Sequence, residues 1–434
     1  MKRTTRWAAA LVGALAAMAP LPAIAQSSLQ VPVQFDFVNP GARSLALGGA
    51  FVGLADDATA ALLNPAGLIE LTRPEVSVEG RVRRFVQPML IGGRLSGVPT
   101  GLGEDTTNSL LRQDIGSLRT APTFGSFVYP RGRWRIAGFG YDLIHLSQDF
   151  SARGTFQNRG FDTRDTAFSA TRSLAVSGAG LSAAVQLPRV WLGGGLLVQR
   201  FRLGFEFDRY LHESFFGAPD PTQSVFHFSQ AGRGTAAGVI VGAMVPLPRA
   251  KIGVAFKRAP RFGFSSFSGG LVGSQQRTDS TFKVPDTLAI GASSALTTRL
   301  SVTAEYTWVR HSQLLDDYVG VLVNQGESRT RADRFSINDG HELHGGVEYL
   351  MPIKWRPALR AGLWFDPDHS VRYRPTPAND LLDERIAANL SSGRDLWHYT
   401  AGTMIAVHPR ADVSAGIDVS ARSTIVSLST IVRF

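Results

Sequence analysis

The chain has 434 residues, of which 44% are hydrophobic and 18% are charged, so it can form a large ordered structure and is not a disordered chain. It contains no cysteine, which excludes disulfide frameworks, thiolate nucleophiles and zinc–thiolate sites. Its formal net charge of +10 raises the question of an anionic partner.

Residues 1–25 have the pattern of a secretory signal peptide. Lys2, Arg3 and Arg6 precede a short apolar run, and an Ala-x-Ala cleavage site occupies 23–25. The apolar run is too short to span a bilayer, which takes about 20 residues. Removing the peptide lowers the net charge from +10 to +7. An exported protein of this charge meets anionic lipid and lipopolysaccharide first, so we expect these partners and no nucleic acid.

Residues 26–73 lack strand-like alternation and predict a separate N-terminal segment with short helices. Gly48-Gly49 in its middle argues against one continuous helix. Either Asp56 or Asp57 is a suitable N-cap for a short helix through Leu63. Hydrophobic residues at spacings of three and four are typical of one face of helical turns, and here they are Leu47, Phe51, Leu54, Ala58 and Leu62.

The stretch Asn64-Pro65-Ala66-Gly67 predicts where this segment turns. Asn64 precedes a proline and is therefore pushed out of helical geometry. Pro in the second position and Gly in the fourth suit a β-turn. We expect these four residues to end the helical segment just before the first strand, predicted over 75–86.

Residues 74–434 predict a barrel of antiparallel strands. Segments of about ten residues alternate apolar and polar side chains, as in the last strand, where Val426, Leu428 and Val432 share one face. A soluble sandwich would show the same alternation, but the connections favour a membrane barrel. Short turns are expected near 130–133, 187–190, 247–251, 296–300, 352–355 and 408–412. Long linkers are expected near 87–120, 149–172, 209–232, 268–283, 313–340 and 370–395, with a brief one near 422.

Six short turns and seven longer connections separate fourteen strands. Strict alternation of short and long connections is typical of bacterial outer-membrane barrels, and closure removes unpaired strand edges. We therefore predict an all-β, 14-stranded antiparallel transmembrane β-barrel in the outer membrane of a Gram-negative-type bacterium. The barrel would hold the partly helical N-terminal segment in its lumen and be a monomer. Aromatic residues near predicted strand ends suggest interfacial girdles, and they are Trp134, Tyr141, Trp191, Tyr306, Trp308, Tyr349, Trp355, Trp364, Trp397 and Tyr399.

The chain ends on Phe434 after alternating apolar residues. This ending is typical of an outer-membrane assembly signal. The barrel assembly machinery of that membrane is therefore an expected partner.

The stretch from Asn39 to Leu71, with its Gly-Gly, Asp-Asp and Asn-Pro-Ala motifs, resembles the N-terminal hatch of FadL-type outer-membrane transporters, the FadL- and TodX-like proteins. Its Gly-Ala-Arg opening is also similar to the PorV-type branch. Weaker similarities occur at 257–267, 282–293, 300–313 and 344–352. The resemblance implies a fourteen-strand barrel plugged by a hatch. It further implies passive uptake of long-chain fatty acids or other hydrophobic molecules, with hatch gating and sideways exit between strands. The gating residues would be Gly48, Gly49, Asp56, Asp57, Asn64, Pro65, Ala66 and Gly67.

A carboxylate-bearing ligand would need a cation in an apolar pocket. Lys257, Arg310 and Arg360 lie on predicted strands or strand ends where they could face inward. The alternative is that these cations pair with inward acids such as Glu305 and Glu348, since buried charges usually find partners.

Within the first long linker, residues 87–102 offer Met89, Leu90, Ile91, Val98 and Leu102 as an exposed apolar surface that could capture a ligand. The same residues could instead fold over the barrel mouth as a lid.

Nothing in the sequence indicates an enzyme, a metal site or a cofactor. The stretch His341-Glu342-Leu343-His344 is one residue too short for a zinc-protease helix, and residues i and i+3 of a strand face opposite sides. No nucleophile elbow or phosphate-binding loop occurs. A hydrophobic-solute transporter is therefore the favoured function. The alternatives are a PorV-like accessory for secretion or surface attachment of proteins and a general porin.

Overall fold

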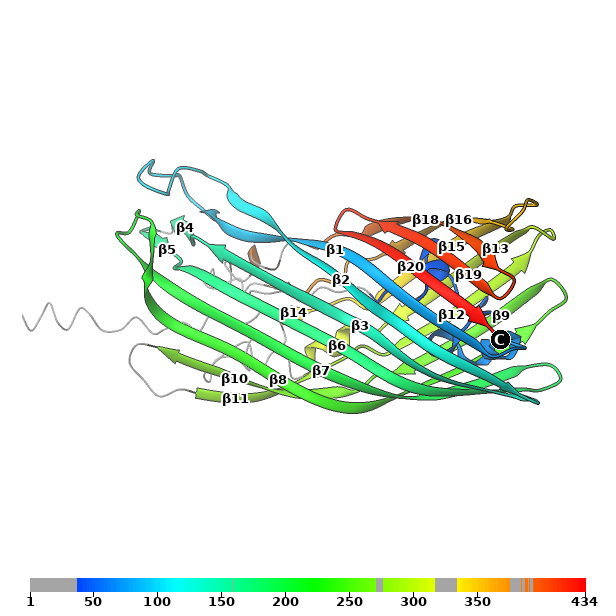
Figure 1. Cartoon of the computed structure of the whole chain (residues 1–434). Helices are drawn as coiled ribbons and strands as arrows, with labels where there is room; N and C mark the ends of the chain where they lie inside the picture. The colour runs from blue at the N-terminus through cyan, green and yellow to red at the C-terminus, as the bar shows by residue number, and fades with distance from the viewer. Residues whose placement is uncertain are drawn as a thin grey trace, which may run out of the picture.

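The computed structural model describes residues 37–158, 160–270, 276–316, 334–374 and 393–434, together with residues 384, 387, 388 and 390. The signal peptide and residues 26–36 lie outside the described residues, so the domain boundaries at 25 and 73 stay predictions. The described chain forms one closed antiparallel β-barrel with short helical turns inside it (Figure 1). The expected fold class is confirmed.

Fourteen strands form the wall, and β1 closes it by pairing with both β2 and β20. Two of the fourteen are interrupted, at Ala259-Pro260 and at 284–286, where prolines lack the N–H that a ladder needs. The wall strands are β1 (Glu75–Arg94), β2 (Leu110–Arg131), β3 (Trp134–Ala152), β6 (Ala167–Gln186), β7 (Trp191–His212), β8 (Pro219–Pro246), β9 (Ala250–Arg258) with β10 (Arg261–Gly270), β11 (Gln276–Lys283) with β12 (Thr287–Ala295), β13 (Leu300–Val309), β15 (Gly340–Leu350), β16 (Ala358–Asp366), β18 (Leu396–His408), β19 (Ala411–Val419) and β20 (Ser423–Arg433).

Short turns and longer loops alternate around this wall as predicted, but several loops are shorter than expected. The first strand runs to Arg94 and not to residue 86, and the predicted linker 209–232 is mostly strand in β7 and β8. In β1 the residues after Phe85 are mostly buried on both faces, so the apolar–polar alternation that marks a strand in the sequence is lost there.

The wall is tall on one side and short on the other (Figure 1). Strands β1, β2, β3, β6, β7 and β8 have 19 to 28 residues, whereas β13, β15, β16, β18, β19 and β20 have 9 to 13. The loops after β13 and β16 include the 3-10 helix η3 (His311–Leu315) and the small sheet of β14 (Phe335–Ser336) and β17 (Arg372–Tyr373). A further hairpin, β4 (Thr155–Asn158) and β5 (Asp162–Arg164), follows β3.

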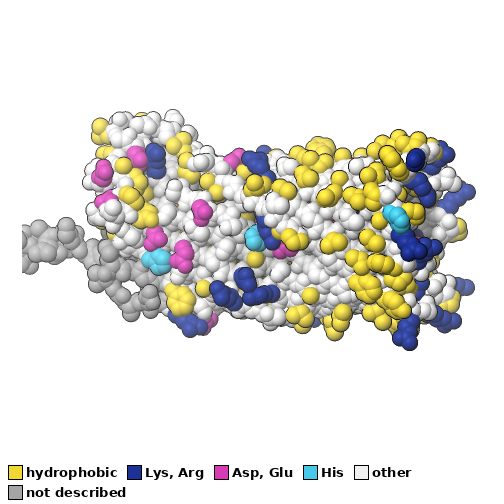
Figure 2. All heavy atoms as spheres, in the orientation of Figure 1, with side chains coloured by type: hydrophobic (Ala, Val, Ile, Leu, Met, Phe, Trp, Pro, Cys, Tyr) yellow, Lys and Arg dark blue, Asp and Glu magenta, His cyan; other side chains and the backbone are white. Residues whose placement is uncertain are grey.

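An apolar band surrounds the half of the barrel nearer the short turns (Figure 2). It is built from outward-facing residues of alternating strand positions, as a lipid-facing surface requires. Its members include Val78, Val82, Phe127, Ile136, Leu181, Leu196, Val241, Ile252, Phe256, Leu343, Leu363, Val426 and Leu428.

The aromatic residues near strand ends divide between the two faces of the wall. Trp134, Tyr349, Trp355, Trp397 and Tyr399 are exposed, as a girdle requires. Three of the predicted girdle members are buried on the inner face, and that part of the prediction was wrong: Tyr141, Trp191 and Trp364. Closeness to a strand end does not determine which face of the strand a residue occupies. Among the described residues, no helix is long and apolar enough to cross a membrane.

The N-terminal segment lies inside the lumen near the short turns (Figure 1). It contains α2 (Ala42–Ala46), α3 (Ala60–Leu63) and the 3-10 helix η2 (Pro65–Glu70), joined by turns. Its apolar side chains share a core with the inner face of the tall wall, where Leu63 and Leu68 lie in one cluster with Phe139 and Ile240. We call residues 37–73 the hatch.

Candidate functional site

The Asn64 side chain of the Asn-Pro motif links two parts of the hatch to each other and links the hatch to the wall. Asn64 is fully buried, and its Oδ1 accepts the N–H of Ala66 at 3.2 Å. Its Nδ2 donates to the carbonyl oxygens of Val52 at 2.9 Å and of Ala243 on β8 at 3.3 Å. One side chain therefore fixes the start of η2, the preceding hatch loop and a strand of the wall.

The residues after Asn64 form the predicted turn and extend it into a helix. Asn64 is in an extended conformation, and Pro65 occupies the first position of η2, where its missing N–H costs nothing. The N–H of Gly67 donates to the Asn64 carbonyl at 2.9 Å. Ala66 and Gly67 are buried, and a side chain on Gly67 would collide with the backbone of Ala55.

The glycine pair brings the hatch backbone against the short wall. Gly48 has φ of +67° and Gly49 has φ of +81°, a region that favours glycine. A Cβ on Gly48 would lie 2.8 Å from the carbonyl oxygen of Gly345 on β15. The Gly48 carbonyl accepts a hydrogen bond from His344 Nδ1 at 2.7 Å. The pair therefore permits a contact that any larger residue would prevent.

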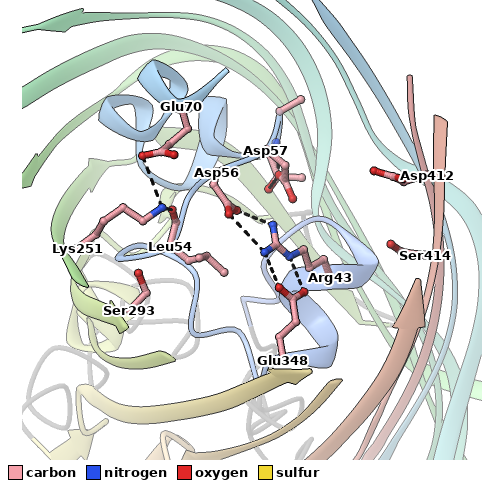
Figure 3. Close-up of polar contacts among 12 residues, drawn as sticks. Arg43, Leu54, Asp56, Asp57, Glu70, Lys251, Ser293, Glu348, Asp412 and Ser414 are labelled. Carbon is pink, nitrogen blue, oxygen red and sulfur yellow. Dashed lines mark hydrogen bonds and ion pairs between the residues drawn. The ribbon is translucent and has the colours of Figure 1, made fainter. Parts of the chain in front are cut away.

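A network of charges fastens the hatch at the short-turn end (Figure 3). Arg43 of α2 pairs with Asp56 at 2.5 Å and with Glu348 of β15 at 2.9 Å. Arg360 of β16 approaches the same Glu348 at 2.6 Å. Burial alone would lower the pKa of Arg43, but the two carboxylates outweigh it and raise that pKa well above its usual range. Arg43 therefore stays charged as the link between hatch and wall.

Asp56 and Asp57 have different roles. Asp56 pairs with Arg43 and does not cap the helix. Asp57 is buried, and its carboxylate accepts the backbone N–H of Thr59 at 2.9 Å and the Thr59 hydroxyl at 2.5 Å, one residue before α3. The N-cap of α3 is Thr59, so the predicted cap at Asp56 or Asp57 was wrong, although Asp57 holds Thr59 in place.

Further bonds fasten the hatch to β9 and to β13. Lys251 Nζ donates to the carbonyl oxygen of Leu54 at 2.8 Å and lies 3.7 Å from Glu70 (Figure 3). Glu305 accepts the backbone N–H groups of Phe51 and Val52 at 2.8 and 2.7 Å. Glu305 was expected from the sequence only as an acid that could pair with a cation, and its bonds to the hatch backbone were not predicted.

A central cavity lies beside the hatch in the lumen. Apolar residues from both the hatch and the wall line it, among them Leu62, Leu63, Leu143, Leu197 and Val309. Its charged and histidine lining residues are Glu79, Arg81, Asp142, Lys257, Glu305, Glu342 and His344, and its other polar lining residues include Asn39, Thr123, Gln199, Thr287 and Thr307. An apolar space with a few convergent polar groups is the usual form of a small-molecule site.

The structure separates the three predicted ligand cations. Lys257 faces the central cavity, and in the part of the chain that the structure describes no hydrogen bond or ion pair to it is present. Arg360 lies outside this cavity and pairs with Glu348, as the alternative of acid pairing expected, and its role in ligand binding stays a prediction. Arg310 is exposed at the N-cap of η3, because β13 alternates inward on odd residues through Val309, and its predicted inward placement was wrong.

The predicted capture loop does not exist at Met89, Leu90 and Ile91. All three residues belong to β1, which continues to Arg94. Met89 and Leu90 are buried, and Met89 packs in a cluster with Phe150, Phe168 and other inner-face residues of the tall wall. They are therefore neither an exposed capture surface nor a lid, although their apolar character does contribute to the lining of the lumen.

The wall has an opening between β2 and β3. These strands share a ladder only between Phe124–Arg131 and Trp134–Tyr141. Beyond Phe124 and Tyr141, on the side away from the short turns, the two strands separate. There β2 pairs with β1 as far as Leu110, and β3 pairs with β6 as far as Ala152. A register shift between Asp142 and Ile144 inserts Leu143 as an extra residue, and such a bulge bends the strand.

A second cavity, the side cavity, lies at this opening. Leu118 and Arg119 of β2 and His145 and Leu146 of β3 line it. It adjoins the central cavity through five shared lining residues: Val38, Arg81, Thr123, Asp142 and Leu143.

An ion pair of Arg119 with Asp142 bridges the opening from β2 to β3. The sequence analysis missed these residues. A usable signal was Pro122, because proline in a strand indicates an edge or a bulge.

Solved structures of other proteins resemble this fold. No protein-family model matches the chain, and no curated protein matches it. A solved FadL homologue from Pseudomonas aeruginosa superposes with a TM-score of 0.64 at 15% identity, covering 93% of this chain and all of that one. The toluene transporters TbuX of Ralstonia pickettii and TodX of P. putida give TM-scores of 0.58 and 0.55 at 16% and 13% identity, each covering 92% of this chain.

The barrel has the FadL-type fold. The coverage extends over 100% of the FadL homologue and 99% of TodX, so the likeness includes the hatch and the wall together.

Within this FadL-type barrel, the His341–His344 stretch lies on β15. His344 contacts Glu342 at 3.2 Å and the hatch at Gly48. Among the described residues, no group of three or more His, Asp or Glu side chains is arranged to hold a metal ion. His344 therefore serves the packing of the hatch, whereas Leu343 faces outward in the apolar band and His341 contacts the Tyr306 hydroxyl.

Proposed function

We propose that this FadL-type barrel is a passive transporter that carries hydrophobic small molecules, such as long-chain fatty acids, across the outer membrane. One observation carries the proposal: the central cavity beside the hatch adjoins a side cavity at an opening in the wall. An apolar molecule that leaves through this opening re-enters the bilayer and never has to cross the polar contacts of the hatch.

The upper lumen supports uptake from outside. Its inner face carries two clusters of buried apolar residues, rich in phenylalanine. Phe201 stacks on Phe262 and Phe282 with ring centroids 5.0 and 5.3 Å apart, and Phe168 lies 5.0 Å from Phe207. Transfer of apolar surface from water to such a lining is favourable by about 25 cal/mol per Å².

In this proposal the hatch is both plug and gate. Its buried hydrogen bonds and ion pairs to β8, β13 and β15 keep the short-turn half of the lumen closed to ions. This arrangement disfavours a general porin, which needs an open aqueous lumen. A PorV-like accessory role draws support only from the Gly-Ala-Arg opening of the hatch.

Lys257 is the residue we assign to the carboxylate end of an acidic ligand. It lies at the central cavity between apolar side chains, and its ammonium could make charge-assisted hydrogen bonds to a carboxylate. A neutral hydrocarbon would use the same apolar lining without it.

Equilibrium binding to delipidated protein tests the function and the assignment together. We expect oleate and toluene to bind to the wild-type protein. Lys257→Gln should weaken the binding of oleate about tenfold or more, because a charge-assisted hydrogen bond is lost. The same variant should leave the binding of methyl oleate unchanged. Arg200→Gln, at an exposed position of β7, is the matched control. Binding of neither probe would overturn the transport proposal, and equal losses for oleate and methyl oleate would overturn the role of Lys257.

A further inference from the structure

The short-turn end of the barrel carries an unusual pattern of charge. Six connections join strands there, at 132–133, 187–190, 247–249, 296–299, 351–357 and 409–410. Each contains at least one Arg or Lys, and none contains an Asp or Glu. The basic residues, which we call the cationic rim, are Arg133, Arg189, Arg249, Arg299, Lys354, Arg356 and Arg410.

All seven residues of the cationic rim are exposed. Figure 2 shows Lys and Arg side chains gathered at this end, directly beyond the apolar band. Within the described residues, no ion pair involves any of the seven, whereas Arg43, Arg360 and Arg433 in the nearby lumen are paired with carboxylates. The charges of the rim are therefore available to an external partner.

Apolar residues accompany these charges in the same turns. Leu187 and Leu247 each precede a Pro-Arg pair, and both are exposed. Leu296, Ile353 and Trp355 are exposed as well, and the ammonium of Lys354 lies 5.9 Å from the Trp355 ring. A basic head beside an exposed apolar or aromatic side chain is the composition of a membrane interface, where one part reaches the acyl chains and the other reaches the headgroups.

We propose that the cationic rim binds the phosphates of anionic glycerophospholipids in the leaflet that meets the short turns. The rim encircles the barrel immediately beyond its apolar band, which is the level of the phosphate layer. Basic residues at a membrane surface attract anionic lipids, and the attraction acts within a Debye length of about 8 Å at physiological salt. A soluble acidic protein would not need the exposed leucines.

The test measures which lipids remain with the protein. The full-length protein is purified from micelles that contain equal amounts of phosphatidylglycerol and phosphatidylcholine, and the retained lipids are quantified by mass spectrometry. We expect phosphatidylglycerol to be enriched about threefold over phosphatidylcholine at low salt, with the enrichment mostly lost in 0.5 M NaCl, where the Debye length is about 4 Å.

Two sets of variants locate the effect. Changing all seven rim residues to Gln should reduce the enrichment to about onefold, whereas changing the six arginines to Lys should preserve it, because lipid phosphates are attracted by charge. Heat-modifiable migration on gels confirms that each variant is folded. An unenriched wild-type protein, or a Gln variant as enriched as wild type, would overturn the proposal. Loss of enrichment in the Lys variant would also contradict it, since charge would then not be the cause.

Discussion

The two halves of the lumen differ in their polar contacts. In the lower lumen, near the short turns, the hatch shares an apolar core with the wall and is also joined to it by ion pairs and buried hydrogen bonds centred on Arg43, Asn64 and Glu305. In the upper lumen, the inner face of the tall wall packs phenylalanine and aliphatic side chains against the loops after β13 and β16.

This difference determines which function each half of the lumen can serve. Hydrogen bonds and ion pairs are directional, so the hatch has one seated position, and losing a partner leaves a buried polar group unsatisfied. Apolar packing is non-directional, so the upper lumen can accept ligands of varied shape. Ion leak through the barrel should therefore respond to changes in the lower lumen and not to changes in the upper lumen.

Removing the hatch should have the largest effect on leak. Deletion of residues 26–73 empties the lower lumen and should raise single-channel conductance in planar bilayers about tenfold or more, because a wide barrel without its plug is an aqueous channel. The barrel should still assemble, as judged by heat-modifiable migration. Unchanged conductance would show that the hatch is not the plug.

Arg43→Gln should have the next largest effect. It leaves Asp56 without its partner and breaks the link to Glu348, a change that costs about 3–5 kcal/mol when a buried ion pair loses one member. We expect frequent channel openings and faster proteolysis of the hatch.

Arg360→Gln is the matched comparison, because Glu348 keeps Arg43 in that variant. It should leak less than Arg43→Gln. The reverse order would mean that the pair within the wall, and not the link to the hatch, seats the plug.

Asn64→Ala should cause a smaller increase in leak. It removes the hydrogen bonds to Val52, Ala66 and Ala243 and leaves buried backbone groups without this partner, at about 1–3 kcal/mol each. We expect brief channel openings in planar-bilayer recordings of this variant. Asn108→Ala, in an exposed loop, is the control. Equal records for the two variants would argue against the Asn-Pro motif as the anchor of the hatch.

Phe201→Ala should not change leak. This fully buried ring stacks on Phe262 and Phe282 in the upper lumen, and its removal should cost about 3–5 kcal/mol of barrel stability. We expect a lower thermal midpoint and weaker oleate binding with wild-type conductance. A rise in conductance comparable with that of Arg43→Gln would erase the distinction between the two halves.

The sequence predicted the fold better than the site. Alternation and the placement of turns were sufficient for fourteen strands, since the membrane demands apolar residues on the outer face. Strand length was underestimated where both faces of a strand are buried, as at Met89 and Leu90, because the alternation that marks a strand is lost there. The hatch motif was recognisable because Asn64, Pro65 and Gly48 have strict backbone requirements.

Site residues were harder to predict, because they depend on the register between neighbouring strands. Arg360 pairs with Glu348, which lies directly opposite it on β15, and Arg119 meets Asp142 across the opening between β2 and β3. The sequence indicated Glu348 as a possible partner but not which of the three cations it pairs with. Pro122 and the bulge at Leu143 are the local causes that could have marked the opening in advance.

The central claim is that hydrophobic molecules leave through the opening between β2 and β3. The chain has no cysteine, so Arg119→Cys with Asp142→Cys gives a single pair of thiols at this opening. A bifunctional thiol reagent with a cleavable disulfide spacer would close it, and the single-cysteine variants are the controls. Uptake of a hydrophobic fluorescent probe by cells should fall about tenfold or more after cross-linking and recover on reduction, if the opening is the exit that apolar transfer requires. Uptake that continues at the same rate through the cross-linked barrel would contradict the account.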